Sequence, residues 1–417
     1  MTSSVIIKQL SWSDEHLADI ALPTGAMRLT RSLASGLCQS AADAPHIFWG
    51  VGDRGPNIKP DIAADQYGTE HLRPLAAIDG AKVMPMPSIG PALARFRIDG
   101  CSVVLEKVIE LTDADGRPIS GLPVPYGPHA EFEPVYDLEG NALPTDANGV
   151  DSEGIAAMPD GSFWIAEEYG PSLLRVDRQG RVLVRWIPRG LQASFVDATY
   201  PVIEALPAIA SARKLNRGFE GIAASTDGLT LFVAFQSPLA HPNRKAHERS
   251  QHVRIWKLHA QTGSLLSEYV YPLDDPESFR RDAAAGKVSR DDIKISEIHL
   301  MPDGDLLVLE RITLSTKIYR CPLHSATGTP VNLSDPDTRP TLEQMSRRDL
   351  QTANIELLEK NLVFSSDDHL EIPADLEGMI HLGSGKLLLS NDSDFGIEGA
   401  ETQFWIVDIG TARIEQR

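Results

Sequence analysis

Apolar runs and tight turns alternate in a pattern that recurs along the chain. Each clear copy starts one residue before a Glu, continues as an apolar run, crosses a PDG, TDG or GSG turn, and ends in a second apolar run. Short β-prone runs joined by such turns predict β-hairpins. Four clear copies begin at Ser152, Phe219, Ser296 and Leu376, and a degenerate fifth copy begins at Gly36.

The segments that follow two of the hairpins add two more strands to each unit. SLLRVDRQGRVLVRWIP (172–188) and IWKLHAQTGSLLSEYVYPL (255–273) each read as two apolar runs around a turn. Four antiparallel strands per repeat are typical of a β-propeller blade. We therefore expect an all-β protein, a β-propeller of five to six four-stranded blades in one domain over residues 1–417. The predicted blade hairpins lie near 36–55, 152–168, 219–237, 296–311 and 376–392.

The repeats are farther apart than blades of a regular propeller, which span about 40–50 residues. The repeated Glu residues are 67, 77 and 80 residues apart, so the blades carry inserted loops. We expect short helices in 200–214, 274–292 and 336–352, and long loop excursions in 55–91 and 112–149, a length that is often functional. A sixth blade would lie between Phe96 and Glu133, and the ring would close by pairing Val5–Gln9 with Phe404–Ile409.

Hairpin geometry predicts a ring of polar side chains around the central axis. The start of the first strand and the end of the second lie at the same edge of an antiparallel hairpin. Residues at equal distances before and after a turn pair across the hairpin, and this rule places each repeated Glu opposite a second polar residue. A shift of the strand register by one residue would turn these side chains to the other face. The predicted pairs are Glu153 with Glu168, Glu220 with Gln236, Glu297 with Arg311 and Glu377 with Asp392, and Asp53 aligns with Glu168 in the first copy.

Crowded carboxylates raise each other's pKa unless cations compensate them. Ca²⁺ takes six to eight oxygen ligands, and arginine binds phosphate in a bidentate manner, so this mixture suits a metal-bridged oxyanion. The absence of a histidine cluster at these positions argues against zinc. Alternatively, such a Glu can bond backbone amides of the next blade and seal the ring. The expected metal ligands are Glu153, Glu220, Glu297, Glu377, Asp53 and Asp392, and the expected catalytic residues are Glu168, Glu167, Arg54, Arg217 and Arg311.

Composition narrows the classes of partner. The formal net charge of −19 disfavours a nucleic-acid binder and an anionic membrane surface, and leaves cations or a small anionic substrate bridged by a cation. Three cysteines give no disulfide framework. The start of the sequence has no apolar run of signal-peptide length, so we expect a cytoplasmic location, or a periplasmic or secreted one if a leader was removed. The oligomeric state is left open.

Two strings resemble a known family. DSEGIAAMPDGSFWIAEEYGPSLLRVDRQGR (151–181) and LNRGFEGIAASTDGLTLFVAFQSPL (215–239) are similar to the phytase-like domain family, described as "esterase-like activity of phytase". The resemblance runs from about Gly36 to Ile409 and implies a β-propeller with phosphoesterase or esterase activity. Many members of the family are secreted or periplasmic. The resemblance also implies which residues correspond to the recurrent polar positions of the family. They are Asp53, Arg54, Glu153, Glu167, Glu168, Arg217, Glu220 and Glu377.

Three functions follow from these patterns. The first is a metal-dependent hydrolase of phosphate esters, with calcium held by the Glu ring and arginines stabilising the transition state. The second is a divalent-metal lactonase of the gluconolactonase kind, with Glu153, Asn216, Asn391 and Asp392 as ligands. The third is a propeller that only binds a partner, because a fold does not fix a function.

Overall fold

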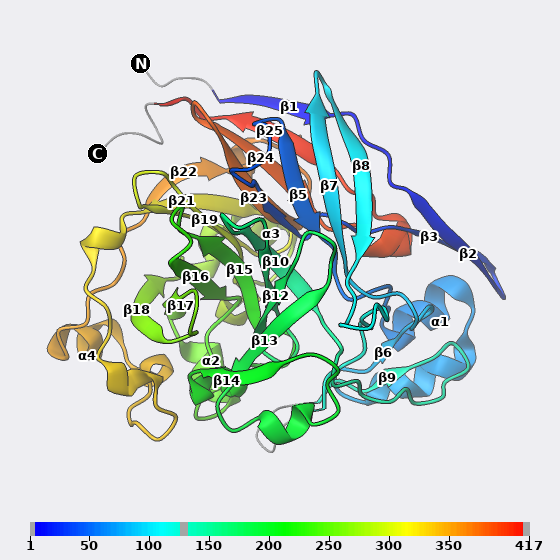
Figure 1. Ribbon diagram of the computed structural model, residues 1–417, viewed down its shortest axis with the longest axis horizontal. Coiled ribbons are helices and arrows are strands. Elements are labelled where there is room, and N and C mark those ends of the chain that lie inside the picture. Colours follow the sequence, from blue (N-terminus) through cyan, green and yellow to red (C-terminus); the bar gives the residue numbers. More distant parts are fainter. Residues whose placement is uncertain (1–4, 126–131, 412–417) are drawn as a thin grey trace.

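The computed structural model describes residues 5–125 and 132–411, and the chain in these ranges is mostly β-structure. Five sheets have four or five strands each, and every one of them contains one of the predicted hairpins as an antiparallel pair (Figure 1). The first three of these sheets are β4 (Gly36–Cys38), β5 (Ile47–Val51), β7 (Ala92–Asp99) and β8 (Ser102–Glu110); β10 (Ser152–Ala157), β11 (Phe163–Glu167), β12 (Ser172–Val176), β13 (Val182–Pro188) and β14 (Val202–Leu206); and β15 (Phe219–Ala224), β16 (Thr230–Phe235), β17 (His252–His259) and β18 (Leu265–Pro272).

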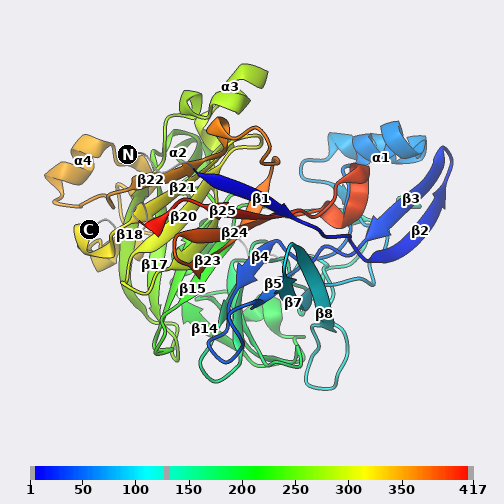
Figure 2. The same ribbon diagram turned by 90° about the horizontal axis from the view of Figure 1, so that it is seen from above.

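The last of these five sheets joins the two ends of the described chain. Its strand β1 pairs antiparallel with β25, from Ile6 opposite Asp408 to Leu10 opposite Phe404, so the predicted pairing of these segments is confirmed. Figure 2 shows β1 alongside β25. The fourth and fifth sheets are β19 (Lys294–Leu300), β20 (Leu306–Arg311), β21 (Thr316–Cys321) and β22 (Asn361–Ser365); and β1 (Ile6–Leu10), β25 (Phe404–Asp408), β24 (Lys386–Asn391) and β23 (Leu376–Gly383).

In each of the five sheets, the first strand of the repeated hairpin contacts its counterparts in two other sheets. These strands form a cycle in the order β4, β10, β15, β19, β23 and back to β4. Glycine permits this close approach. A Cβ atom on Gly36 would lie 2.3 Å from the carbonyl oxygen of Glu153, and one on Gly154 would lie 2.2 Å from that of Glu220. Any side chain at these positions would push neighbouring strands apart. Close packing of the strands therefore requires glycine at Gly36 and at Gly154, which follows a repeated Glu.

The segment that was expected to hold a sixth blade is used differently. Residues 96–110 form the end of β7 and the whole of β8 in the first sheet. In the described part of 111–149 the only named strand is β9, so no further four-stranded sheet is found there. Two small sheets complete the strands: β2 (His16–Leu22) with β3 (Gly25–Thr30), and β6 (Lys82–Val83) with β9 (Val135–Tyr136).

Short helices occupy the inserted loops, including the three segments where they were expected. All four α-helices have eight residues or fewer within the described ranges. They are α1 (Pro60–Tyr67), α2 (Arg244–Arg249), α3 (Arg280–Ala285) and α4 (Arg347–Thr352); the 3-10 helices are η1 (Glu70–Ala77), η2 (Gln192–Phe195), η3 (Ala208–Ala212), η4 (Pro276–Ser278), η5 (Arg290–Asp292), η6 (Leu323–Ser325), η7 (Val331–Ser334), η8 (Leu342–Gln344), η9 (Ser366–Asp368) and η10 (Asp394–Gly399).

The insertion that follows β5 builds a lobe beside the larger sheets. Met27 and Leu29 of β3 pack with Ile58, Leu72 and Val83 of the insertion in a small buried core of their own. Figure 2 shows α1, β2 and β3 set to one side of the larger sheets. The lobe matters for function because its loops carry polar residues back to the centre of the cycle of strands.

Candidate active site

A cavity of about 230 Å³ lies where the five large sheets meet, and each of them contributes to its lining. Every residue that lines it is charged or carries an amide. Nine carboxylates face four cationic side chains and three amides. The lining residues are Asp53, Arg54, Asn57, Lys82, Asp151, Glu153, Glu168, Asn216, Glu220, Gln236, Lys294, Arg311, Asp375, Glu377, Asp392 and Asp394.

β-Bulges aim the repeated Glu residues into this cavity. The register of β10 against β11 shifts between Ser152 and Gly154, and that of β23 against β24 shifts between Leu376 and Gly378. Glu153 and Glu377 are therefore the extra residues of their strands. A bulge of this kind leaves one residue out of the ladder and re-aims its side chain. The β15–β16 pair shifts in the same region, between Phe219 and Ile222. None of the predicted pairs is a ladder pair in these three hairpins, because Ser152 pairs with Glu167, Phe219 with Phe235 and Leu376 with Asn391.

The remaining hairpin, β19 with β20, departs further from the prediction. Here the register shifts between Ile295 and Glu297, one residue earlier than in the first hairpin, so Ser296 is the extra residue. Glu297 then pairs with Leu309 and Lys294 pairs with Arg311, and the predicted pairing of Glu297 with Arg311 is wrong. Lys294 and Arg311 line the cavity.

Glu297 does not line the cavity. Its carboxylate is 1% exposed and accepts hydrogen bonds from the backbone N–H groups of Ile298 (2.9 Å) and Leu37 (3.3 Å). Burial raises the pKa of this carboxyl group well above its usual value. Glu297 thus ties β19 to β4, which is not its neighbour in the cycle. Its role is structural, although the bonded amide does not belong to the next blade as the structural alternative for these residues predicted.

Glu167 lies behind the cavity wall rather than in it. Its carboxylate is fully buried and accepts hydrogen bonds from Ser172 Oγ (2.9 Å) and the N–H of Gly170 (3.0 Å). Arg185 Nη2 lies 3.1 Å from Glu167 Oε2. Burial raises the pKa of Glu167, with Arg185 opposing. These contacts hold the strand end that presents the next residue, Glu168, to the cavity.

Four buried acceptor atoms of the cavity have no hydrogen-bond partner in the described part of the chain. They are Asp151 Oδ2, Glu168 Oε1, Glu220 Oε2 and Gln236 Oε1, from residues that are 3%, 3%, 2% and 5% exposed. Of these atoms, Asp151 Oδ2 has a cationic neighbour, Arg54 Nη1 at 3.4 Å. Buried polar atoms are nearly always paired, because an unpaired one loses its hydration without compensation. One carboxylate oxygen each of Glu153, Glu168 and Glu220 lies within 4.8 Å of the other two, a separation that a cation can bridge.

Two further carboxylate groups extend this cluster. Asp53, Asp151 and Glu153 form one, and Asp53, Asp392 and Asp394 form the other, with the same limit of 4.8 Å between oxygens. Asp53 and Glu153 therefore each belong to two groups. Seven of the nine carboxylates thus form one connected path across the cavity.

The cationic side chains hold fixed positions at the edges of this path. Arg311 is 2% exposed, donates from Nη1 to Asp375 Oδ1 (2.7 Å), and bonds Glu377 through Nη2. Arg54, 3% exposed, bonds Glu133 and lies 3.4 Å from Asp151.

Two other cationic residues approach the carboxylates. Lys82 Nζ donates to Asn57 Oδ1 (2.9 Å), and both residues come from the lobe. Arg217 is outside the lining but is close enough to Glu168 and Glu220 that their charges act on its pKa, which burial lowers. Its Nη1 is buried and has no hydrogen-bond partner among the described residues.

The excess of carboxylates shifts the pKa values of the side chains in the cavity. Burial and the neighbouring charge of Glu377 raise the pKa of Glu220 to about 8. Burial also raises the pKa of Glu377 to about 8, although Arg311 opposes this shift. Burial and the neighbouring carboxylates Glu220 and Glu168 raise the pKa of Glu153 well above its usual value. Arg311 and burial lower the pKa of Lys294 to about 8. Without a bound cation, the carboxylates therefore share protons near neutral pH.

A strained segment holds the last two carboxylates in place. Asp394, Phe395 and Glu398 have φ values of 45°, 57° and 60°, in the left-handed region that side chains rarely adopt. Asp392 accepts a bond from Ser32 and from the N–H of Asp394 (3.2 Å). Strain of this kind persists only where surrounding contacts enforce it, and it is common at functional sites.

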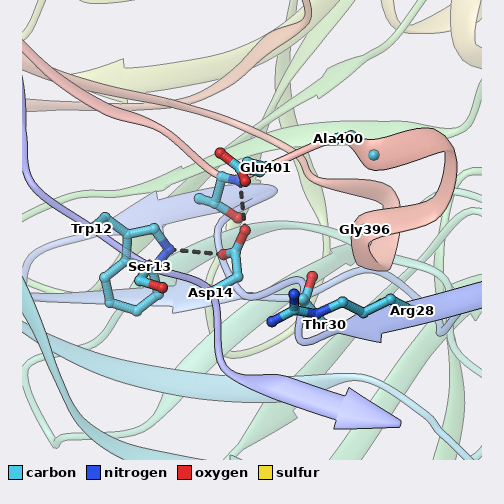
Figure 3. Close-up of a pocket in the computed structure, with 10 residues that line it drawn as sticks. Trp12, Ser13, Asp14, Arg28, Thr30, Gly396, Ala400 and Glu401 are labelled. Carbon is cyan, nitrogen blue, oxygen red and sulfur yellow. Dashed lines mark hydrogen bonds between the residues drawn. The ribbon is translucent and has the colours of Figure 1, made fainter. Parts of the chain in front are cut away.

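The same segment borders a second cavity, of about 290 Å³, shown in Figure 3. One of its two carboxylates, Asp14, accepts one bond at each oxygen, from Trp12 Nε1 (2.8 Å) and from the N–H of Thr402 (2.8 Å). The protein itself therefore supplies a partner to both oxygens of Asp14. The cavity that holds Glu168 and Glu220, called the acid cavity from here on, keeps oxygens without such partners.

Several cavity residues escaped the sequence-based prediction although the repeats contain a signal for some of them. Asp151 and Asp375 stand two residues before a repeated Glu, and Lys294 stands three residues before one. Aligning the repeats upstream of the Glu would have found them. Lys82, by contrast, comes from an insertion with no repeat.

The family comparison agrees with the resemblance seen in the sequence. The model of the phytase-like family, described as esterase-like activity of phytase, matches residues 35–395. The chain therefore belongs to the phytase-like family. It is also 29% identical over 292 residues to an uncharacterized secreted protein of Arthroderma benhamiae, a match that covers 64% of this chain and 54% of that relative. The chain thus spans about half the length of this curated relative.

Solved structures are similar only at low levels. A luciferin-regenerating enzyme matches with a TM-score of 0.35 and 8% identity, covering 97% of this chain and 95% of the other. Virginiamycin B lyase from Staphylococcus aureus matches with a TM-score of 0.34 and 10% identity, covering 96% and 98%. These values carry no argument about function. None of the described helices is long and apolar enough to span a bilayer.

Proposed function

We propose that this chain is a divalent-cation-dependent hydrolase of small phosphate esters, built as a single-domain, five-bladed β-propeller. The cyclic contacts of the first strands and the β1–β25 pair support the closed ring. The observation that carries the function is the set of unpartnered buried oxygens of Glu168, Glu220 and Gln236 in an acidic cavity.

Calcium is the cation that this donor set fits best. Carboxylate and amide oxygens are hard ligands, and Ca²⁺ accepts six to eight of them in irregular geometry. Glu153, Glu168 and Glu220 would hold it, with the amide oxygen of Gln236 in reach. Asp53, Glu377 and Asp392 complete the acidic surround. When bound, the ion neutralises charge on a phosphoryl oxygen and makes phosphorus more open to attack.

The lining of the cavity favours a compact, polar substrate. No lining residue is aliphatic or aromatic, so a leaving group with a large apolar surface gains no contact there. Arg54, Lys82, Lys294 and Arg311 supply the positive charge that a phosphate needs. Phosphorylated polar alcohols therefore fit better than aryl phosphates or fatty acyl esters.

The residues of the chain then divide the work of hydrolysis. Arg311, fixed by Asp375 and Glu377, is placed to neutralise the phosphoryl oxygens, with Arg217 and Arg54 adding positive potential. As the bond from the water oxygen to phosphorus forms, the ester P–O bond breaks and yields inorganic phosphate and an alcohol. Lys294 Nζ, with its pKa near 8, donates a proton to the leaving oxygen and regains one from the attacking water.

Phosphate release from phytate and a panel of polar and aryl phosphates, with calcium titrated from zero, tests this function. We expect calcium-dependent release that falls at least about 100-fold in Glu168→Gln, the loss typical of removing one electrostatic contributor. The exposed Glu139 gives a matched control, Glu139→Gln, which should keep full activity. Absence of release from every substrate at every calcium level would overturn the proposal.

The lactonase alternative loses one of its predicted ligands. Asn391 does not line the cavity, because its Nδ2 donates to the carbonyl oxygens of Asp392 (2.8 Å) and Glu401 (3.0 Å). Glu153, Asn216 and Asp392 do line it. A sugar lactone added to the same assay panel distinguishes this reading, and a role as a partner-binding platform predicts no turnover at all.

The relative's description bears on where the protein works. Because that relative is described as secreted, we favour the secreted or periplasmic alternative over the cytoplasmic expectation. Extracellular calcium concentrations would fill a site of modest affinity. We propose a small anionic substrate as the partner, and neither nucleic acid nor a membrane.

A further inference from the structure

A third cavity, far more basic than the acid cavity, lies between the loops of the second, third and fourth sheets. Its volume is about 640 Å³, within the range of small-molecule sites. Four arginines and one histidine line it against a single carboxylate, in a chain where acidic residues outnumber basic ones 58 to 39. The residues with charge are Arg189, Arg213, His241, Arg244, Asp337 and Arg339.

Two of these arginines have no carboxylate partner. Within the described ranges, no carboxylate oxygen lies within 4.0 Å of the guanidinium of Arg189 or of Arg339. Arg339 Nη1 donates only to the carbonyl oxygens of Pro336 (2.7 Å) and Thr338 (2.8 Å) and meets His241 Nε2 at 3.3 Å. These carbonyls hold the guanidinium in place and leave its charge uncompensated.

A third arginine is built into the cavity wall. Arg213 is 3% exposed, donates from Nε to the carbonyl oxygen of Tyr169 (2.6 Å), and stacks over the Tyr169 ring at 5.2 Å. Its position is therefore set by the fold rather than by solvent. Apolar side chains, among them Leu191 and Ile209, form most of the remaining wall, together with the polar Ser211 and Asn243.

We propose that this cavity binds a small organic carboxylate, with an apolar body against Leu191 and Ile209 and its carboxylate on Arg189 and Arg339. Arginine matches a carboxylate with two parallel N–H donors, and unpaired arginines beside apolar wall favour an amphiphilic anion over an inorganic one. The ligand class differs from that of the acid cavity, so the proposal stands independently of the proposed hydrolysis.

Calorimetric titration with sodium octanoate in the presence of a chelator tests the site. Octanoate should bind at one site per chain, and 1-octanol, which has the same body without the charge, should bind at least tenfold more weakly. Arg189→Gln and Arg339→Gln together should weaken octanoate binding at least tenfold. Arg348→Gln, an exposed arginine on α4 outside the cavity, is the matched control and should bind as the wild type does.

Further variants separate the possible failures. Leu191→Trp leaves every charge in place and narrows the cavity, so it should also weaken binding if the apolar body lies there. Glu168→Gln should leave octanoate binding unchanged. Equal affinity for octanol and octanoate, unchanged binding by the double variant, or binding of inorganic sulfate without octanoate would each overturn the proposal.

Discussion

Two buried charge clusters in this protein are built on opposite principles. Arg254 in β17 is 1% exposed and is paired with Glu343 through Nε (2.7 Å) and Nη2 (3.0 Å), and with Glu268 through Nη1 (2.8 Å). Trp256 Nε1 (2.7 Å) and Thr329 Oγ1 (2.8 Å) satisfy the oxygens of Glu268. The cluster fastens the insertion that carries η8 to the third sheet. Two carboxylates share one guanidinium, and every carboxylate oxygen has a hydrogen-bond partner, so we call the cluster matched in this sense.

The acid cavity leaves buried carboxylate oxygens unpaired. Glu168 and Glu220 each keep one buried oxygen without a hydrogen bond from the described chain, in a cavity where nine carboxylates face four cationic groups. A structural cluster gains nothing from such unpaired oxygens, because unpaired buried charge is costly. The difference indicates that the cavity is completed by something outside the chain, and a divalent cation supplies the missing charge.

Breaking the matched cluster should give the largest effect on stability. Arg254→Met leaves Glu268 and Glu343 buried without their counter-charge, which costs about 3–5 kcal/mol of unfolding free energy. Urea denaturation measures the loss. The exposed pair of Arg73 with Glu70 is the control, because solvent screens an exposed ion pair and Arg73→Met should therefore cost far less than Arg254→Met. Equal losses would show that burial and pairing of Arg254 do not matter.

Binding of a divalent cation in the acid cavity should increase the stability of the protein. A cation that binds only the folded state stabilises it by about 2.7 kcal/mol at 100 times its dissociation constant. Chelator-treated protein should therefore melt at a lower temperature than protein with calcium, and calcium should restore the melting temperature. In Glu168→Gln the shift should shrink. Identical melting curves with chelator and with calcium would count against a cation site.

Paired and unpaired carboxylates should also respond oppositely to pH. Asp274 is an example of a paired carboxylate: burial raises its pKa, but Lys360 and Lys317 outweigh burial and lower the pKa from 3.8 to about 2. The contribution of about 2 kcal/mol from Asp274 is therefore present above pH 4 and lost as the pH falls toward 2. Glu220 and Glu377 have pKa values raised from 4.5 to about 8. Their protonated forms are favoured by folding, so that stability is lost as the pH rises from about 4.5 through 8.

Unfolding free energies measured from pH 2 to 9 in chelator check these signs. Asp274→Asn should flatten the acid limb alone, and Glu220→Gln should flatten the limb between pH 5 and 8. A wild-type stability that rises steadily from pH 5 to 8 without a cation would contradict the uncompensated state of the cavity.

Glu220→Gln should produce the smallest and most telling change. In chelator at pH 8 it removes part of an uncompensated charge and should stabilise the protein by about 1 kcal/mol, within the usual cost of an unsatisfied buried group. With saturating calcium the same variant loses a ligand and should be less stable than the wild type. A variant that is destabilised equally in both conditions would mean that Glu220 is a structural residue.

The sequence predicted the units of the fold well because local pattern determines them. Each hairpin turn and the pairing of β1 with β25 followed from apolar runs and tight turns, and the short helices lie in the expected insertions. The expectation that polar residues meet at one place rested on the same hairpin geometry. Eight of the eleven residues named as catalytic or metal-binding line the acid cavity, the exceptions being Arg217, Glu167 and Glu297.

The remaining errors come from features that pattern does not encode. In β10 the bulge lies at Glu153, and in β19 it lies one aligned position earlier, at Ser296. As a result Glu297 is buried in the wall of the cavity, and Lys294 lines the cavity instead. No propensity distinguishes these two positions. Lys82 reaches the cavity from a lobe whose packing depends on contacts with β3, which lies far away in the sequence.

Calorimetric titration of calcium into chelator-treated protein shows whether a divalent cation completes the acid cavity. We predict saturable binding to the wild type and to Glu139→Gln, and at least about tenfold weaker binding to Glu168→Gln and Glu220→Gln, because each loses a cation ligand. Binding of equal strength in all four proteins would place the ion elsewhere. No binding to the wild type would contradict the claim that a divalent cation completes the acid cavity.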